Sequence, residues 1–266
     1  MNIPAIAFFN GKGGCGKTTG LINTAGVLSA NGEKLLIIDM DKQRNTTDIF
    51  LQDKQSLYEE GKSQTLYDVF AGNAALKDVI KKAYLVGIGQ RKAYYHNIDV
   101  VPADIRFQNE NGLKELKVDI REELERLVED NGYTYILIDM PPSNEMINTI
   151  CFTQIVNNII VPFSPDIFSV SGYNDLMQII SEARKINDNL NIIGIYLSRY
   201  RSRNYQIKEA LKSFGKMFID EIQIPFSAQI EDTVLEGRPI SYYKRKGKSR
   251  EAFEKLTEII ISRCVV

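Results

Sequence analysis

A glycine-rich segment near the start of the chain has the spacing of a phosphate-binding loop. Residues 11–18 read GKGGCGKT and match the pattern G-x-x-x-x-G-K-[ST]. Glycines allow the backbone to turn successive N–H groups toward an anion, and the following helix adds the positive end of its dipole. In this pattern Lys17 reaches the β- and γ-phosphates of a nucleotide, and the Thr18 hydroxyl binds Mg²⁺. The predicted nucleotide contacts are Gly11, Lys12, Gly13, Gly14, Cys15, Gly16, Lys17, Thr18 and Thr19.

Aspartates follow two further apolar runs. Asp39 and Asp41 come directly after residues 35–38, and Asp139 comes after residues 135–138. The carboxyl ends of parallel strands form the ligand-binding edge of an open α/β sheet, so these side chains are expected close to the phosphate loop. The alternative for Asp39 and Asp41 is a capped turn that leads into the next helix.

Short apolar runs alternate with longer helical patterns along the chain. This alternation predicts an α/β protein, with a mostly parallel, doubly wound sheet and helices on both faces, built as a single domain over residues 1–266. The expected strands are residues 6–9, 35–38, 98–101, 135–138, 159–161, 192–195 and 222–224. The expected helices are residues 17–30, 65–83, 107–130, 168–187, 204–215 and 249–263. Residues 51–66 and 84–96 contain no clear strand and are expected to be irregular.

The net charge, the cysteines and the apolar runs of the chain limit which partners and which cellular compartment are expected. The net charge of −1 over 266 residues gives no overall excess that would indicate nucleic acid, so any DNA contact must use a local patch. Cys15, Cys151 and Cys264 lie far apart without metal-ligand spacing, which is typical of thiols in a reducing cytosol. The sequence contains no run of 18 apolar residues and no basic leader pattern, so a cytoplasmic location is expected.

The phosphate loop resembles that of a known family. Residues 10–19, NGKGGCGKTT, are similar to the deviant P-loop, or Walker A motif, of the ParA/Soj/MinD ATPases. In that family the additional lysine, here Lys12, reaches across an ATP-sandwich dimer to the phosphates bound by the partner subunit. The physical role is that of an arginine finger, which supplies a cation to developing charge. The alternative is a solvent-facing lysine that only steers ATP.

The aspartate segments carry the same resemblance. Residues 39–47, DMDKQRNTT, resemble the family's D-x-D-P-Q-G-N-x-T, which implies that Asp41 orients the attacking water and that Asp39 lies near Mg²⁺. Lys42 and Arg44 stand where the family has proline and glycine. Residues 135–143, YILIDMPPS, look like Walker B with a D-x-P-P-S extension, which implies that Asp139 holds a Mg²⁺-bound water.

These resemblances define the expected site. The catalytic group is Lys12, Lys17, Asp41 and Asp139, and the metal group is Thr18, Asp39 and Asp139. Residues 222–225, IQIP, resemble the family's strand and proline next to the base, which implies that Pro225 and Phe226 contact adenine.

Two basic clusters lie in the C-terminal third, where ParA relatives carry residues for sequence-independent DNA contact. Clustered lysines and arginines neutralise phosphates and release counterions. The residues expected to contact DNA are Arg201, Arg203, Lys244, Arg245, Lys246, Lys248 and Arg250. A solvated charged surface is the alternative for both clusters, and a position next to the nucleotide base is an alternative for Arg199 or Arg201.

The resemblance covers nearly the whole chain and implies an ATP-dependent, nucleoid-associated partition ATPase. ATP would close a homodimer that binds DNA nonspecifically, and a ParB-type centromere-binding protein would stimulate hydrolysis. A MinD-like membrane-associated or other cargo-positioning ATPase is the first alternative. Against a membrane, residues 249–263 place Phe253, Leu256, Ile259 and Ile260 on one stripe, which is typical of a core helix. A metal or electron carrier, which would need a bridging cysteine pair, and a non-hydrolysing nucleotide sensor are further alternatives.

Overall fold

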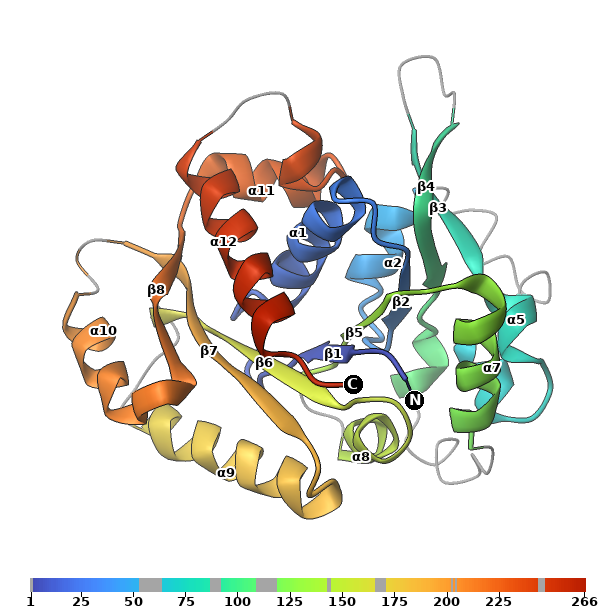
Figure 1. Ribbon diagram of the computed structural model, residues 1–266, viewed down its shortest axis with the longest axis horizontal. Helices are drawn as coiled ribbons and strands as arrows, with labels where there is room; N and C mark the ends of the chain where they lie inside the picture. Colours follow the sequence, from blue (N-terminus) through green and yellow to red (C-terminus); the bar gives the residue numbers. More distant parts are fainter. Residues whose placement is uncertain are drawn as a thin grey trace.

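A single sheet organises the computed structural model, which describes residues 2–52, 64–86, 92–108, 119–142, 145–165, 171–201, 203, 205–243 and 247–266. Within these residues the sheet contains eight strands in the order β3-β4-β2-β5-β1-β6-β7-β8 (Figure 1). The strands are β1 (Ala5–Phe8), β2 (Leu35–Asp39), β3 (Lys81–Val86), β4 (Lys92–Val101), β5 (Tyr135–Asp139), β6 (Asn158–Phe163), β7 (Asn191–Tyr200) and β8 (Phe218–Pro225).

Every neighbouring pair in this order is parallel except β3 and β4, which are antiparallel. Strands β1, β2 and β6 are buried along their whole length, because helices cover both faces of the sheet. Such strands are expected to be apolar on both faces rather than alternating. The expected mostly parallel, doubly wound α/β sheet is therefore confirmed.

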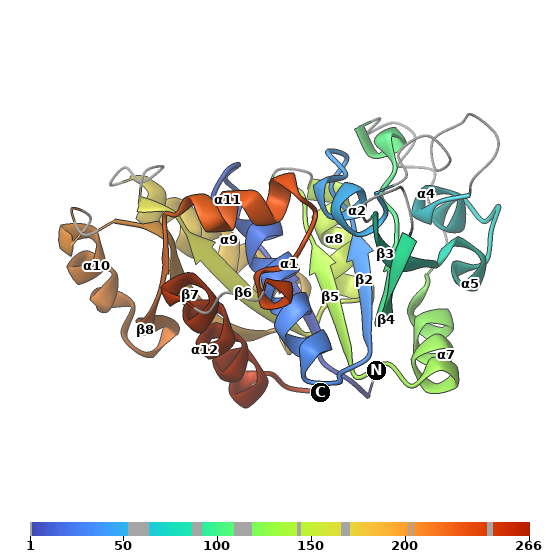
Figure 2. The same cartoon turned by 90° about the horizontal axis from the view of Figure 1, so that it is seen from above.

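Helices lie on both faces of the sheet (Figures 1 and 2). The α-helices are α1 (Lys17–Ala30), α2 (Asn45–Phe50), α4 (Leu66–Phe70), α5 (Leu76–Val79), α7 (Arg121–Asn131), α8 (Glu145–Gln154), α9 (Ser171–Ile186), α10 (Tyr205–Leu211), α11 (Ala228–Leu235) and α12 (Lys248–Arg263). The short 3-10 helices are η2 (Ile105–Gln108), η5 (Lys212–Met217) and η6 (Ile240–Tyr242).

The sheet separates two hydrophobic cores. Successive side chains of β1 point to opposite faces, so Ala5 and Ala7 join one core and Ile6 and Phe8 join the other. The first core contains apolar residues of α4, α5, α7, α8 and α9, and the second contains those of α1, α2, α11 and α12. This packing fixes the start of α1 next to the carboxyl-terminal ends of the central strands β2 and β5, where the phosphate loop lies.

Two predictions of secondary structure were wrong near β3, at the edge of the sheet. Residues 65–83 do not form one helix: α4 and α5 are short, and residues 81–83 belong to β3. Residues 84–96 are not irregular throughout, because Lys81–Val86 and Lys92–Val101 pair as an antiparallel hairpin. An edge strand is open to solvent on one side and therefore lacks the continuous apolar run that marks a buried parallel strand. The expected irregular segment 51–66 and the expected helix 107–130 fall partly outside the described residues.

The C-terminal helix confirms its predicted core stripe. Phe253, Leu256 and Ile260 of α12 are buried in the second core, and Ile259 packs against it half-buried. Three shorter helices, α2, α8 and α11, were not expected from the apolar pattern. Among the residues that the structure describes, no helix is long and apolar enough to cross a membrane.

Candidate nucleotide site

The phosphate loop connects β1 to α1 at the centre of the sheet. Its backbone requires glycine at two places, because Gly14 has φ +73° and Gly16, immediately before α1, has φ +96°. A Cβ atom at Gly16 would also lie 3.3 Å from the Cβ of Ser198 on β7. Close contact between loop and strand therefore adds to the requirement for glycine at this position.

Lys17 points back into the loop. Its side chain is nearly buried, and Nζ donates hydrogen bonds to the carbonyl oxygens of Asn10 at 3.0 Å and Lys12 at 3.2 Å. Asn10 is itself held by a bond of 2.9 Å from Nδ2 to the Pro162 carbonyl at the end of β6. The Ser198 hydroxyl donates to the Cys15 carbonyl at 2.5 Å. The lysine head is thus already inside the loop in which phosphate oxygens would be bound.

Asp139, the last residue of β5, lies beneath this loop. Its Oδ2 atom accepts hydrogen bonds from the hydroxyls of Thr18 at 2.8 Å and Thr46 at 2.7 Å. Its Oδ1 atom is buried and has no hydrogen-bond partner among the described residues. Burial raises the pKa of Asp139 to about 6, although the hydrogen bonds from Thr46 and Thr18 act in the opposite direction. A buried carboxylate oxygen without a partner, next to the Thr18 hydroxyl, suits a hydrated Mg²⁺, which binds few protein ligands and keeps several waters.

Asp39 ends the neighbouring strand β2 but has different contacts. Its Oδ2 atom accepts hydrogen bonds from the backbone N–H of Thr47 at 2.8 Å and from the Thr47 hydroxyl at 2.7 Å, and its Oδ1 atom accepts from the Asp41 N–H at 3.1 Å. Burial, and then the charge of Asp139, raises the pKa of Asp39 well above its ordinary value. These contacts hold the loop between β2 and α2, so the expected place of Asp39 near Mg²⁺ stays a prediction.

Asp41 lies at the wall of the nucleotide cavity. It is 8% exposed, and its Oδ1 atom accepts a hydrogen bond of 2.9 Å from the Gln43 N–H. Arg44, which stands where the family has glycine, adopts the left-handed φ of +58° and precedes α2. Because an arginine retains the backbone conformation that favours glycine, this departure leaves the turn intact. Lys42 is exposed.

A cavity of about 590 Å³ extends from the phosphate loop to β8 and α11. The loop and Asp41 line its polar end, whereas apolar side chains line the other end. The apolar lining residues include Ile224, Pro225, Phe226, Ile230, Val234 and Leu235. The predicted base contacts Pro225 and Phe226 are therefore on the wall of the same cavity as the phosphate loop.

Two arginines flank the Phe226 ring. The Arg201 guanidinium carbon lies 3.9 Å from the ring centroid and that of Arg199 lies 5.1 Å from it. Arg199 also lines the cavity, with a left-handed φ of +52°. Arg201 therefore lies next to a predicted base contact, and both its expected DNA contact and the alternative place next to the base stay predictions.

The remaining basic residues are dispersed among the described segments. Arg203 and Lys248 are exposed. Arg250 Nε donates to Glu254 at 2.8 Å, and its Nη1 donates to the Tyr243 carbonyl at 3.2 Å. The expected DNA contacts Lys244, Arg245 and Lys246 lie outside the described residues. DNA contact by these clusters stays a prediction.

The fold brings four further residues to the site that no sequence prediction included: Thr46, Thr47, Tyr196 and Ser198. Thr46 and Thr47 belong to the segment that resembles N-x-T, which was the available signal. Tyr196 and Ser198 lie on β7, and no local motif marks them.

A phosphate loop after β1, with carboxylates at the ends of β2 and β5 in a mostly parallel sheet, defines a P-loop nucleotide-binding protein. The family model described as an AAA domain matches residues 3–192. The chromosome partitioning protein ParA of Caulobacter vibrioides is 32% identical over 97% of this chain and 94% of that protein. The chain belongs to this AAA-domain family and to the ParA/Soj/MinD superfamily of partition ATPases.

Two solved structures have the same fold. The septum site-determining protein MinD of Pyrococcus horikoshii, in complex with Mg-ADP, has a TM-score of 0.72 and 26% identity, over 97% of this chain and 96% of that one. A putative plasmid partition protein of Borrelia burgdorferi, bound to AMPPNP, has a TM-score of 0.76 at 21% identity, over 98% of this chain and 99% of that one. The second likeness concerns the fold alone.

Proposed function

We propose that this protein is an ATP-dependent DNA-partitioning ATPase that works as one domain. ATP and Mg²⁺ close a homodimer, the dimer binds DNA nonspecifically in the cytoplasm at the nucleoid, and a ParB-type partner stimulates hydrolysis and release. The observation that carries the proposal is the cluster beneath the phosphate loop, where Thr18 and Thr46 both donate to one oxygen of Asp139. The other oxygen has no partner within the described segments.

Nucleotide binding exchanges contacts that are already present. Lys17 donates to two loop carbonyls, and a triphosphate offers its ammonium group stronger acceptors in the same place. Thr18 and Asp139 would hold Mg²⁺, which neutralises charge on the β- and γ-phosphates when it is bound. Pro225 and Phe226 would bind the adenine at the apolar end of the cavity.

Hydrolysis requires a positioned water and added positive charge. Asp41 lies on the cavity wall, from which we infer that its carboxylate orients the attacking water. Lys12 is half-buried at the start of the loop and would reach the phosphates bound by the partner subunit, where its cation would stabilise the transition state.

The hydrogen bond from Thr46 to Asp139 would couple the state of the nucleotide to the position of α2. Thr46 begins the buried part of α2 and donates a hydrogen bond to Asp139, the carboxylate that would hold hydrated Mg²⁺ through its other oxygen. A shift of Asp139 on Mg²⁺ binding would therefore move the start of α2. Loss of the γ-phosphate would reverse this adjustment and open the dimer, as in other nucleotide switches.

The packing of α12 supports DNA rather than a membrane as the surface on which the dimer moves. Its apolar stripe is buried against α1 and β8, and Glu251 and Glu258 are exposed. This stripe is therefore not available for insertion into a lipid surface.

Phosphate release and sedimentation together test the proposal. Wild-type protein with ATP and Mg²⁺ should sediment as a dimer and release phosphate slowly. Asp41→Asn should remain dimeric with ATP and lose hydrolysis, whereas Lys12→Ala should bind ATP as a monomer. A wild type that binds ATP, stays monomeric and releases no phosphate would contradict the proposal and favour a nucleotide sensor.

A further inference from the structure

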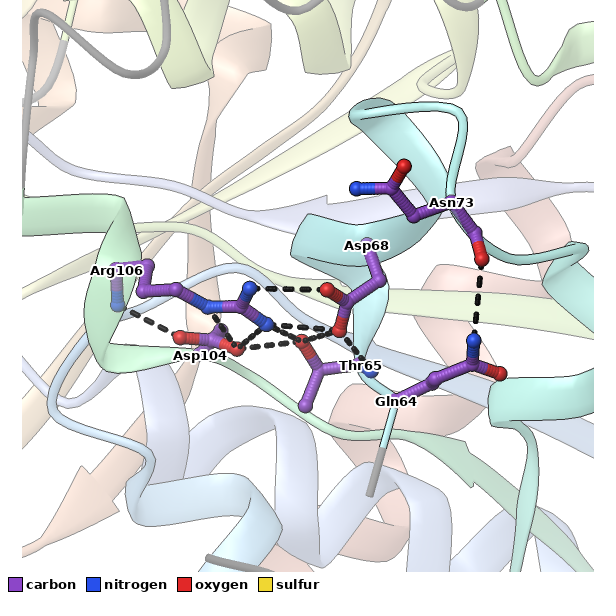
Figure 3. Close-up of polar contacts among 6 residues, drawn as sticks. All are labelled: Gln64, Thr65, Asp68, Asn73, Asp104 and Arg106. Atoms are coloured by element: carbon purple, nitrogen blue, oxygen red, sulfur yellow. Dashed lines mark hydrogen bonds and ion pairs between the residues drawn. The ribbon is translucent and has the colours of Figure 1, made fainter. Parts of the chain in front are cut away.

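A cluster of polar side chains ties α4 to the segment that follows β4 (Figure 3). Arg106 Nη2 donates to Asp68 Oδ2 and to Asp104 Oδ2, each at 2.7 Å, and Arg106 Nε donates to Asp104 Oδ2 at 3.0 Å. The Thr65 hydroxyl donates to the same Asp104 oxygen at 2.5 Å. We call Thr65, Asp68, Asp104 and Arg106 the Arg106 clamp. No residue of the clamp lines the nucleotide cavity.

A chain of buried hydrogen bonds joins the clamp to the loop that carries Asp41. Ala103, which precedes Asp104, donates its N–H to the Thr47 hydroxyl at 3.0 Å. The Thr47 hydroxyl donates to Asp39 Oδ2 at 2.7 Å, and Asp39 Oδ1 accepts the Asp41 N–H at 3.1 Å. Each step is short and shielded from water, so a shift of the clamp is transmitted to Asp41 rather than absorbed by solvent.

A second contact runs through Phe107. This side chain follows Arg106 in η2, is 1% exposed and lines a cavity of about 90 Å³. The other lining residues are Met40, Asp41, Lys42, Gln43, Pro141 and Pro142. Asp41, Gln43 and Pro142 also line the nucleotide cavity, so they form a wall between the two cavities. Phe107 therefore supports this wall from the side opposite the nucleotide.

We propose that the Arg106 clamp is a positioning element for hydrolysis, which sets the place of Asp41 through Ala103, Thr47 and Asp39 and through Phe107. This inference rests on the proposed role of Asp41 in orienting water. Removal of the Arg106 guanidinium leaves Asp104 with its charge nearly buried and Asp68 without its bidentate partner, so η2 moves. Misplacement of a catalytic group by about 1 Å can cost about a hundredfold in rate.

The kinetic test compares ATP turnover in Arg106→Gln, Thr47→Val and the double variant. Each single change should lower kcat by about tenfold and leave KM for ATP within about twofold, since neither side chain lines the nucleotide cavity. The double variant should be no slower than the slower single variant, because both changes break one chain of contacts. Thr47→Ser, which keeps the hydroxyl, should recover most of the loss. Arg106→Lys, which keeps the charge but not the bidentate contact with Asp68, should recover only part of it.

A matched control separates positioning from general stability. Tyr133→Phe removes a buried hydrogen bond of 2.8 Å to Asp99, far from Asp41, and should lower the unfolding temperature while kcat stays at the wild-type value. A wild-type kcat in Arg106→Gln would overturn the inference. Losses that multiply in the double variant would also overturn it, because they would show two independent effects.

Amide hydrogen exchange provides a second readout that does not depend on turnover. In Arg106→Gln the backbone amides of Asp41 and Thr47, both bonded to Asp39, should exchange about tenfold faster, while those of β6 keep their rates. Unchanged exchange at Asp41 and Thr47 would overturn the inference. Asp41→Asn distinguishes the two proposals, because wild-type hydrolysis in that variant removes the proposed role of Asp41 and leaves the clamp to be decided by exchange.

Discussion

The Thr46 hydroxyl, at the start of α2, donates a hydrogen bond of 2.7 Å to the Oδ2 atom of Asp139 at the end of β5. The Thr18 hydroxyl at the start of α1 donates to the same oxygen at 2.8 Å. Three elements that are distant in sequence therefore meet at one buried carboxylate. The other oxygen of that carboxylate has no hydrogen-bond partner in the part of the chain that the structure describes, and this asymmetry is the basis of the proposed Mg²⁺ site.

Asp139→Asn should separate stability from metal binding. The amide keeps an acceptor for Thr18 and Thr46 but removes a buried charge, so the nucleotide-free protein should gain about 1 kcal/mol in its free energy of unfolding. The affinity for Mg²⁺ in the presence of ATP should fall about 10- to 100-fold. Denaturant unfolding and Mg²⁺ titration measure the two effects.

Asp99→Asn is the control for this change. Asp99 is also buried, but it accepts a hydrogen bond of 2.8 Å from Tyr133 and forms an ion pair with Lys82, away from the phosphate loop. Asp99→Asn should lower the free energy of unfolding and leave the affinity for Mg²⁺ unchanged. Equal Mg²⁺ affinity in Asp139→Asn and the wild type would exclude Asp139 from the metal site.

Lys17→Ala should impair ATP binding, whereas Lys12→Ala should impair hydrolysis. Loss of Lys17 removes the ammonium group inside the loop, so ATP affinity should fall about a hundredfold, as expected for a charge-assisted contact. Loss of Lys12 should leave ATP affinity nearly unchanged but reduce hydrolysis by about a thousandfold, because its cation acts in the transition state of the dimer. Calorimetric titration and phosphate release distinguish the two. Normal hydrolysis in Lys12→Ala would leave that lysine only the steering role.

Gly20→Ala should destabilise the start of α1 by about 1–3 kcal/mol, because a Cβ atom there would collide with the Tyr196 hydroxyl and lie 2.9 Å from the Phe8 ring. Tyr196 is buried and its hydroxyl has no hydrogen-bond partner, so Tyr196→Phe alone should cost little. Adding Tyr196→Phe to Gly20→Ala should restore part of the unfolding temperature. A double variant as unstable as the sum of both changes would show that the collision is elsewhere.

The Arg106 clamp should lose its contribution to stability only in strong acid. Burial alone would raise the pKa of Asp68 and Asp104, but the hydrogen bonds from Arg106 and Thr65 outweigh it and hold both pKa values below the ordinary 3.8. A carboxylate with a lowered folded-state pKa stabilises the fold above its unfolded pKa, and this stability is lost as the pH falls through the folded value.

The unfolding temperatures of the wild type and Arg106→Gln measure this effect. At pH 7 the variant should unfold about 2–3 °C lower, a small difference because 45% of the Arg106 side chain is exposed and its ion pairs are screened. The difference should persist at pH 5 and shrink as the pH falls through the lowered pKa values of the two carboxyls. A difference that stays unchanged throughout acid titration to full protonation would contradict the ion-pair contribution.

The sequence predicts the centre of the sheet well. Buried parallel strands such as Leu35–Asp39 and Tyr135–Asp139 are apolar on both faces, and the glycines of residues 11–18 mark the loop between a strand and a helix. The β3–β4 hairpin was missed because Lys81 and Lys82 begin an edge strand whose charged side chains interrupt the apolar pattern.

Long-range contacts set the limit for the site. The place of Arg201 over Phe226 depends on the pairing of β7 with β8, which no local pattern encodes. The sequence alone therefore left both DNA contact and a place next to the base open for this arginine. Thr46 reaches Asp139 only because the loop after β2 turns back toward β5. Local motifs therefore predicted which residues bear chemistry, whereas tertiary pairing determined which of them meet.

We propose that ATP switches this protein to a form that binds DNA without sequence preference. The direct measurement is the affinity of wild type and Lys12→Ala for a random DNA duplex with ATP, with ADP and without nucleotide, at two salt concentrations. We expect binding by the wild type only with ATP, a steep loss of that binding at higher salt, and no binding by Lys12→Ala. Equal DNA binding in all nucleotide states, or none while ATP still forms the dimer, would contradict it.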